Sequence, residues 1–297
     1  MLSPYEYVYF QRELDNSDNA GFFDRYGRWE DIDIYKSKQG TDWQKKLFEK
    51  TGVKQNYNLS INGGNKDLVY SISYTRDDEA YILRTSNFRR DNLNIKLSKK
   101  LYPNLKLDFN PKMSYTVIDG PSISSGNKLR DCVMYPPIGT LTDLTDEDIA
   151  GDGDIIFENI SDLHDPFYNT ANEYKKQTKF SNSYNVGLSW EIIKGLTLRG
   201  EGTYAFQRDR TDNIWLTKTG EANGLGGHPV AKRNYDEGTR WTARVFLTYK
   251  KTFGDHSIDA MAGIEYNNSE SENMLINSDY FPDEYLSLIH ISEPTRH

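Results

Sequence analysis

The sequence predicts an all-β protein, an antiparallel up-and-down β-barrel that crosses a membrane with its strands. Eight segments alternate apolar and polar residues with period two, and the connections between them alternate between short and long. Aromatic residues make up 13% of the 297 residues, which is untypical of a disordered acidic chain. No run approaches the roughly 18 consecutive apolar residues of a membrane-spanning helix, so the sequence excludes a helical membrane protein.

The alternation locates each predicted strand. In residues 105–115 the odd positions are apolar, and in residues 196–206 the even positions are apolar or glycine. Each segment is long enough for the nine to eleven or so residues that a tilted strand needs to cross hydrocarbon. The predicted strands are residues 53–62, 67–76, 88–99, 104–117, 176–190, 195–210, 238–252 and 256–272.

The connections fall into two classes by length. Tight turns are predicted at residues 63–66, 100–103, 193–195 and 254–255. Longer connections are predicted at residues 77–87, 118–175 and 211–237. Outer-membrane barrels have short periplasmic turns and long extracellular loops, whereas a soluble sandwich has no reason to separate loop lengths by side.

This orientation predicts two rows of aromatic rings, one at each membrane interface, where such rings suit the boundary between lipid and water. The periplasmic row contains Trp190, Tyr249 and Phe253. The extracellular row contains Tyr115, Phe206, Trp241 and Tyr266. The alternative is a soluble antiparallel sheet with one wet face, in which these aromatic residues are ordinary strand formers.

The polar face predicts a barrel of more than eight strands. An open sheet edge cannot face lipid, because its unpaired backbone groups are costly there. Closure at eight strands leaves an interior just wide enough for side chains, and the charges predicted inside it would need near-complete pairing. We therefore predict an arc of a wider barrel. The predicted inward charges are Lys54, Lys96, Lys106, Asp108, Lys112, Arg199, Glu201, Arg244, Asp259 and Glu265.

No enzyme is predicted, because no catalytic, cofactor-binding or metal-ligating residue stands out. The five histidines have no partner at metal-ligand spacing, and Gly224–Gly227 lacks the lysine of a phosphate-binding loop and is interpreted as a loop tip. The acidic residues between 143 and 165 fail the EF-hand spacing. Counted from Asp146, the fifth position is Ala150 and the twelfth is Phe157, so a solvated loop is the better interpretation. Cys132, the single cysteine, is interpreted as a small buried hydrophobe. The net charge of −8 argues against a nucleic-acid partner.

Several stretches resemble the SusC/RagA family of TonB-linked outer-membrane transporters of Bacteroidetes. They read GTDWQ at residues 40–44, QNYNLSINGG at 55–64, YSISY at 70–74, SNFRR at 86–90, KGLTLR at 194–199 and YKKTFGDH at 249–256. The resemblance implies a barrel of about 22 strands with an N-terminal plug. It also implies a SusD-like lipoprotein lid, energy from the TonB complex through the plug, contact with outer-membrane lipid, and a glycan, oligosaccharide or peptide ligand. No cofactor is implied.

The two ends of the sequence carry separate expectations. The first residues lack the features of a signal peptide, so either the protein is cytoplasmic or Met1 is not its natural start. Residues 1–50 are expected to join the plug to the barrel, with Thr41 and Gln44 capping a short helix that packs through Trp43 and Leu47. Residues 51–285 are expected to form the partial barrel. The segment LSLIHISEPTR at 286–296 resembles the translation of a transposase adapter used for short-read DNA libraries, so residues 286–297 are expected to be an artefact.

The sequence thus predicts a fragment of a transporter in the bacterial outer membrane, with residues 118–175 and 211–237 as the ligand or lid contacts; individual substrate-binding residues are not identified. One alternative is a self-contained eight-stranded outer-membrane barrel with a structural or adhesive role. A second is a secreted soluble β enzyme acting on polysaccharide. For the second, carboxylates such as Asp152 and Asp154 lack the positioning of an acid and a base.

Overall fold

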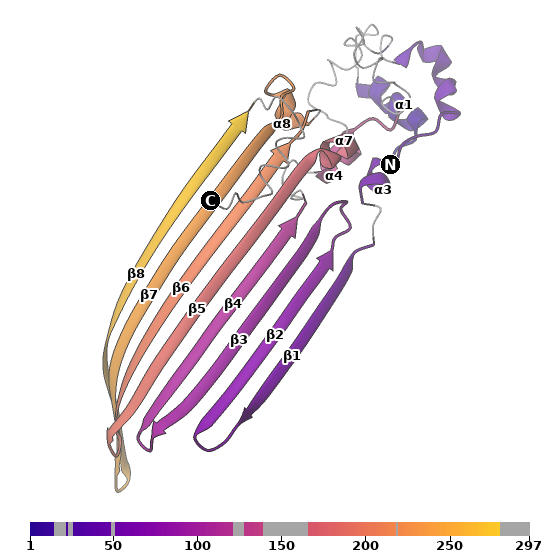
Figure 1. The fold of residues 1–297 in the computed structure, drawn as a ribbon. Helices are drawn as coiled ribbons and strands as arrows, with labels where there is room; N and C mark the ends of the chain where they lie inside the picture. The colour runs from indigo at the N-terminus through magenta and orange to yellow at the C-terminus, as the bar shows by residue number, and fades with distance from the viewer. Residues whose placement is uncertain are drawn as a thin grey trace.

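The computed structural model describes residues 1–14, 22, 26–48, 51–120, 128–138, 166–217 and 219–279. Eight strands and a group of short helices make up these residues (Figure 1). The strands are β1 (Val53–Gly64), β2 (Leu68–Ala80), β3 (Asn87–Tyr102), β4 (Leu105–Asp119), β5 (Glu173–Ile193), β6 (Leu196–Trp215), β7 (Val230–Phe253) and β8 (His256–Asp279). The helices are α1 (Pro4–Leu14), the 3-10 helix η1 (Trp29–Lys36), α3 (Trp43–Leu47), α4 (Lys128–Met134), α7 (Pro166–Ala171) and α8 (Gly220–Asn223). None of the helices in these ranges is long and apolar enough to cross a bilayer.

The strands form one antiparallel sheet in which each strand pairs with its neighbours in the chain, from β1 to β8. The fold class predicted from the alternation is therefore confirmed. Figure 1 shows the sheet as a curved arc, with the tight turns at one end and the helices at the other. We call these the turn end and the cap end. Among the described strands, β1 and β8 do not pair with each other, so the arc is open.

Local chemistry explains the tight turns. Between β1 and β2, the Asn65 side chain accepts hydrogen bonds from the backbone N–H groups of Asp67 and Leu68, each at 2.9 Å, which closes the turn. Gly195 and Gly254 adopt positive φ angles of 87° and 57° in the two later two-residue turns, a conformation that glycine reaches without a side-chain clash. All four turns lie where the sequence predicts them, give or take a residue or two.

The strands extend further toward the cap end than predicted. β7 begins at Val230 and not at residue 238, β8 ends at Asp279 and not at 272, and β5 begins at Glu173. The connection expected at 77–87 shrinks to residues 81–86, and the one expected at 211–237 shrinks to 216–229. The contrast between short and long connections is therefore weaker than predicted. The physical reason is that apolar alternation stops where the strands leave the apolar layer, while ladder pairing continues through charged side chains: Arg210 and Arg233 both contact Asp212, at 2.7 and 2.5 Å.

The apolar side chains of the sheet do not form a core. They gather on one face, and many are exposed, including Leu59 (63%), Val245 (46%) and Ile264 (77%). A soluble sheet would cover this face with a second layer, but none of the described elements does so (Figure 1). An exposed apolar face on a single curved layer is what a lipid-facing barrel wall requires.

Most of the buried apolar residues lie at the cap end, in the helices and in the adjoining ends of β6 and β7. Trp43 and Leu47 of α3 pack with Leu83, Cys132 and Tyr135, and Phe167 of α7 joins this cluster. The Trp43 ring meets Tyr135 edge-on at 5.2 Å, and its indole N–H donates to the Pro136 carbonyl oxygen at 2.8 Å. The predictions that Trp43 packs its helix and that Cys132 is buried are both confirmed. A second cluster, Val8, Phe22, Ile32 and Tyr35, joins α1 to η1.

The predicted capping box at Thr41 and Gln44 is wrong. The N-cap of α3 is Asp42, whose carboxylate accepts from the Lys45 backbone N–H at 2.9 Å. The capping box is at α1, where Ser3 and Glu6 exchange bonds: the Ser3 N–H donates to Glu6 Oε2 at 2.8 Å, and the Glu6 N–H donates to Ser3 Oγ at 3.3 Å.

Candidate functional site

The inner face of the arc carries the polar side chains of the sheet. All ten predicted inward charges lie on this face by strand register, and partners across strands pair several of them. Lys54 contacts Glu79 at 2.5 Å, and Lys250 contacts the predicted inward residue Asp259 at 2.8 Å. The face assignment made from the sequence is therefore confirmed.

Near the turn end, one cluster joins three strands of the inner face. Arg199 Nε donates to Glu201 at 2.7 Å, and its Nη1 contacts Asp108 at 3.3 Å and Ser189 Oγ at 2.6 Å. Lys106 adds a contact to Asp108 at 3.1 Å. Because each charge has a partner, the cluster ties β4, β5 and β6 together and leaves no charge for a ligand.

A hollow of about 490 Å³ lies higher on the inner face, across β5 to β8. It surrounds Gly238, where no side chain fills the space. Register places Ser181, Gln207, Gly238 and Ser271 opposite one another in one row of four strands. The neighbouring row includes Arg240, which lies between Ala205 and Ser269. The hollow therefore offers hydroxyl, amide and guanidinium groups, and the Asp236 carboxylate of the row above also lines it.

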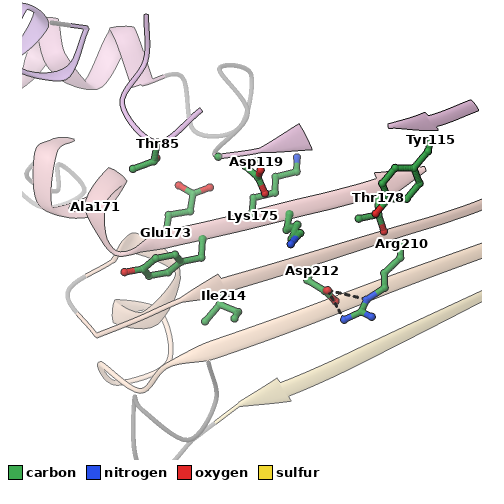
Figure 2. A pocket seen from close by; sticks show the side chains of 13 residues that line it. Thr85, Tyr115, Asp119, Ala171, Glu173, Lys175, Thr178, Arg210, Asp212 and Ile214 are labelled. Atoms are coloured by element: carbon green, nitrogen blue, oxygen red, sulfur yellow. Dashed lines mark hydrogen bonds and ion pairs between the residues drawn. The ribbon is translucent and has the colours of Figure 1, made fainter. Parts of the chain in front are cut away.

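A second hollow, of about 500 Å³, opens on the opposite side of the sheet at the cap end (Figure 2). Tyr115, Thr178, Arg210 and Asp212 belong to the outer face by register, and Figure 2 shows the Arg210–Asp212 ion pair inside this hollow. The outer face of a barrel points away from its lumen, so this hollow does not line the lumen. It is not a candidate for ligand passage.

The predicted extracellular row of rings is present on the outer face. Phe206 lies 6.4 Å from Phe180, which is paired in register with Tyr115, and Trp241 stacks on Tyr266 with ring centroids 4.8 Å apart. The sequence analysis did not include Phe180 in this row, although its alternation with Lys179 and Ser181 would have placed it there. Trp190, Tyr249 and Phe253 of the other row lie close to the turn end.

The two long connections predicted to contact ligand or lid are only partly described. In the first, α4 and α7 pack on α3, while residues 121–127 and 139–165 lie outside the described residues. The acidic residues between 143 and 165 and His164 fall in that gap. A buried ion pair fastens this connection to the sheet: Lys128 Nζ lies 2.5 Å from Glu173 Oε2, and both side chains are at most 5% exposed.

The second connection contains α8, which Thr219 caps by accepting from the Ala222 N–H at 3.3 Å. Gly224–Gly227 follows α8, and the positive φ angles of Gly226 and Gly227 form the turn that leads back to β7. No group of three or more histidine, cysteine, aspartate or glutamate side chains in the described ranges could hold a metal ion.

Proteins with related sequences include two TonB-dependent receptors, although no family model matches the chain. This chain is 40% identical over 73 residues to the TonB-dependent receptor SusC of Bacteroides thetaiotaomicron. The aligned segment covers 24% of this chain and 7% of that protein. The chain is also 24% identical over 246 residues to the TonB-dependent receptor P3 of Formosa agariphila. That alignment covers 78% of this chain and 23% of that protein.

The fold is shared with solved structures of the RagAB peptide transporter. One superposes with a TM-score of 0.68 at 18% identity, over 99% of this chain and 35% of that chain. The open-open state of the RagAB peptide importer gives a TM-score of 0.69 at 17% identity with the same coverage. The chain is similar, in sequence and in fold, to a segment of a SusC/RagA-type TonB-dependent receptor.

TonB-dependent receptors belong to the bacterial outer membrane, and the eight strands match part of the β-barrel of the RagAB transporter chain. The segment spans 7% and 23% of the length of the two curated receptors and 35% of the solved chains. In such a barrel the outer face contacts lipid, the inner face lines the lumen, and the short turns are periplasmic.

Proposed function

We propose that this segment forms part of the wall of a TonB-dependent transporter that imports glycans, oligosaccharides or peptides across the outer membrane. The observation that carries the proposal is the superposition of 99% of the chain on the RagAB peptide transporter. The local identity of 40% to SusC points the same way. The segment contributes a lipid-facing wall, a lumenal surface and an extracellular cap, and we propose no enzymatic role for it.

The proposed partners are a SusD-like lipoprotein lid and the TonB complex acting through a plug. Ligand would be captured at the extracellular end under the lid, and TonB would then act on the plug. We retain the division at residue 50 between an N-terminal segment and the partial barrel of residues 51–285. Because α3 packs on α4 and α7 at the cap end, we propose that the N-terminal segment adds to the extracellular cap in addition to any role as a plug junction.

Growth and uptake test the proposed function. A strain lacking the full-length parent is expected to lose uptake of at least one glycan, oligosaccharide or peptide class, and a complementing copy is expected to restore it. A parent with a mutated TonB box is the matched control for energy coupling and is expected to bind its ligand without importing it. Unchanged uptake of every class in the deletion strain would contradict the proposal.

The cap connections are the proposed ligand or lid contacts. Replacing residues 121–165 of the full-length parent by a short Gly-Ser linker is expected to abolish co-purification of the lid or ligand uptake, while heat-modifiable migration on gels shows that the barrel is folded. A matched insertion at residues 254–255, at the periplasmic end, is expected to leave both unchanged. If the linker variant keeps both lid and uptake, the assignment of this connection is wrong.

Sequencing of the genomic locus tests the assignment of residues 286–297, which lie outside the described residues. We propose that the reading frame departs from LSLIHISEPTRH after about Tyr285 and continues into further strands. A genome that encodes these residues followed by a stop codon would overturn the proposed artefact.

A further inference from the structure

One band of the inner face has no carboxylate. It consists of three adjacent rows of eight positions, one from each strand, and we call it the acid-free band. The upper row is Asn58, Thr75, Asn92, Ser114, Ser181, Gln207, Gly238 and Ser271. The middle row is Ser60, Ser73, Asn94, Lys112, Ser183, Ala205, Arg240 and Ser269. The lower row is Asn62, Ser71, Lys96, Asn110, Asn185, Thr203, Thr242 and Asn267.

The rows that flank the band are different, because they contain carboxylates that partners hold. Above it, Asp77 contacts Arg90 at 3.1 Å and Asp209 contacts Lys179 at 3.1 Å. Below it, the Asp108–Arg199–Glu201 cluster lies beside the band. In a chain with net charge −8, the absence of acids from three successive rows is a local reversal of the overall charge.

The three cations of the band are free. Among the described residues, no hydrogen bond or ion pair engages the side chains of Lys96, Lys112 or Arg240, and all three are exposed. Arg244 lies on the same strand and face as Arg240 but below the band, and its Nε contacts Glu265 at 2.6 Å. Lys100 and Lys175, on the same face outside the band, also have no side-chain partner among the described residues, so the band is set apart by its lack of carboxylates rather than by its free cations alone.

The band rises diagonally along the lumen wall. In β1 its middle row is Ser60, four residues from Gly64 at the turn end, whereas in β8 it is Ser269, 13 residues from His256. Seven strand spacings make the band about 34 Å long. It thus leads from near the periplasmic end toward the extracellular side, where the Gly238 hollow widens it.

The chemistry of the band selects a hydroxyl-rich anion. Serine, threonine and asparagine side chains supply donors and acceptors for hydroxyl groups, and the Asn185–Thr203 bond of 2.8 Å and the Thr242–Asn267 bond of 2.6 Å hold part of this surface in place. Ala205 is the one apolar side chain of the three rows, so the band has no pocket for the apolar side chains of a peptide. Free guanidinium and ammonium groups bind carboxylate or sulfate oxygens by charge-assisted hydrogen bonds.

We propose that the acid-free band is the lumenal path of an acidic oligosaccharide, whose oxyanion groups bind Arg240, Lys112 and Lys96 in turn. The Gly238 hollow accommodates a sugar ring beside Arg240. This inference rests on the proposed transport function and names the class of its substrate. Three separated weak contacts suit a ligand that must move along the wall, because none of them holds it permanently.

The test measures ligand binding to the full-length receptor in detergent by titration calorimetry. The probes are a galacturonic acid tetrasaccharide, a sulfated galactose tetrasaccharide, a neutral galactose tetrasaccharide and an acidic tetrapeptide of equal charge. The triple variant Lys96→Gln, Lys112→Gln, Arg240→Gln is expected to weaken binding of at least one acidic sugar roughly tenfold, and the neutral sugar less than about twofold. Arg244→Gln is the matched control and is expected to leave the affinity unchanged.

A second variant tests the hollow without removing charge. A Cβ at Gly238 would meet only the Glu270 carbonyl oxygen, at 3.7 Å, so Gly238→Gln is tolerated by the backbone and fills the hollow. It is expected to weaken acidic-sugar binding as well.

The proposal would be overturned if the triple variant weakened binding of acidic and neutral sugars equally, or if the peptide bound as strongly as the acidic sugars. Unchanged affinity of the triple variant for the acidic sugars would also overturn it, because the band would then face the plug and not the ligand. If the folded full-length receptor binds and imports none of these probes but is needed for uptake of a ligand of another class, this inference is overturned and the transporter function stands.

Discussion

Two single side chains, Lys128 and Glu173, fasten the first long connection to the sheet. Their ion pair of 2.5 Å is almost wholly buried, so either charged group without its partner would be neither paired nor hydrated. Breaking such a pair by removing one partner costs about 3–5 kcal/mol, whereas replacing both by apolar residues is often neutral. We expect Glu173→Gln to accelerate hydrogen exchange of α4 and α7 in the full-length receptor, and the double variant Lys128→Met, Glu173→Leu to restore protection. Equal exchange in the single and double variants would show that the pair is not what holds the connection.

Glu6 makes the start of α1 sensitive to pH. Hydrogen bonds from Ser3, first from its backbone N–H and then from its hydroxyl, lower the pKa of the Glu6 carboxyl. A lowered pKa in the folded state means that the stabilisation is present above the ordinary glutamate pKa of about 4.3 and is lost as the pH falls through the folded value. We expect exchange protection of α1 to fall on acidification below that range. Glu6→Gln is expected to remove most of this pH dependence, and an unchanged pH profile in that variant would contradict the assignment.

Cap residues also show where sequence reasoning is limited. Thr41, Asp42 and Gln44 all have side chains that cap helices, and only the backbone decides that Asp42 occupies the N-cap position. The Ser3–Glu6 box has the same spacing, with Pro4 at the first helical position, and was visible in the sequence. Single-residue register at short helices depends on tertiary contacts, here the Trp43–Pro136 bond, which no local pattern contains.

At the scale of the strand, alternation predicted the existence, order and facing of all eight strands, and it failed at their ends. Period-two hydropathy arises from lipid on one side, so it stops where the lipid stops. Beyond that level both faces of β6 and β7 are charged, and Arg233 and Asp212 maintain the pairing. The acid-free band was equally hidden, because it runs across strands and is visible only once the register is known.

The two faces of β7 give a direct test of which side meets lipid. Val245 faces outward and Thr248 faces inward by register. An arginine on the lipid face near the bilayer midplane costs about 2–4 kcal/mol, whereas a lumenal arginine remains hydrated. We expect Val245→Arg to lower the free energy of unfolding of the full-length receptor in lipid vesicles by that amount, and Thr248→Arg to change it little. Equal losses would indicate a soluble sheet or reversed faces.

For the whole molecule, the open arc determines what the isolated segment can do. β1 and β8 each leave one edge of backbone N–H and C=O groups unpaired among the described strands, and such edges cannot face lipid. We therefore expect residues 51–279, produced alone and refolded in detergent, to give no heat-modifiable band on gels, whereas the full-length parent gives one. The matched comparison is a known eight-stranded outer-membrane barrel refolded in the same way. A compact, heat-modifiable and monomeric form of the segment would mean that β8 can pair with β1. The self-contained barrel would then replace the transporter wall as the account of this chain, and the inward charges would have to pair across a narrow lumen.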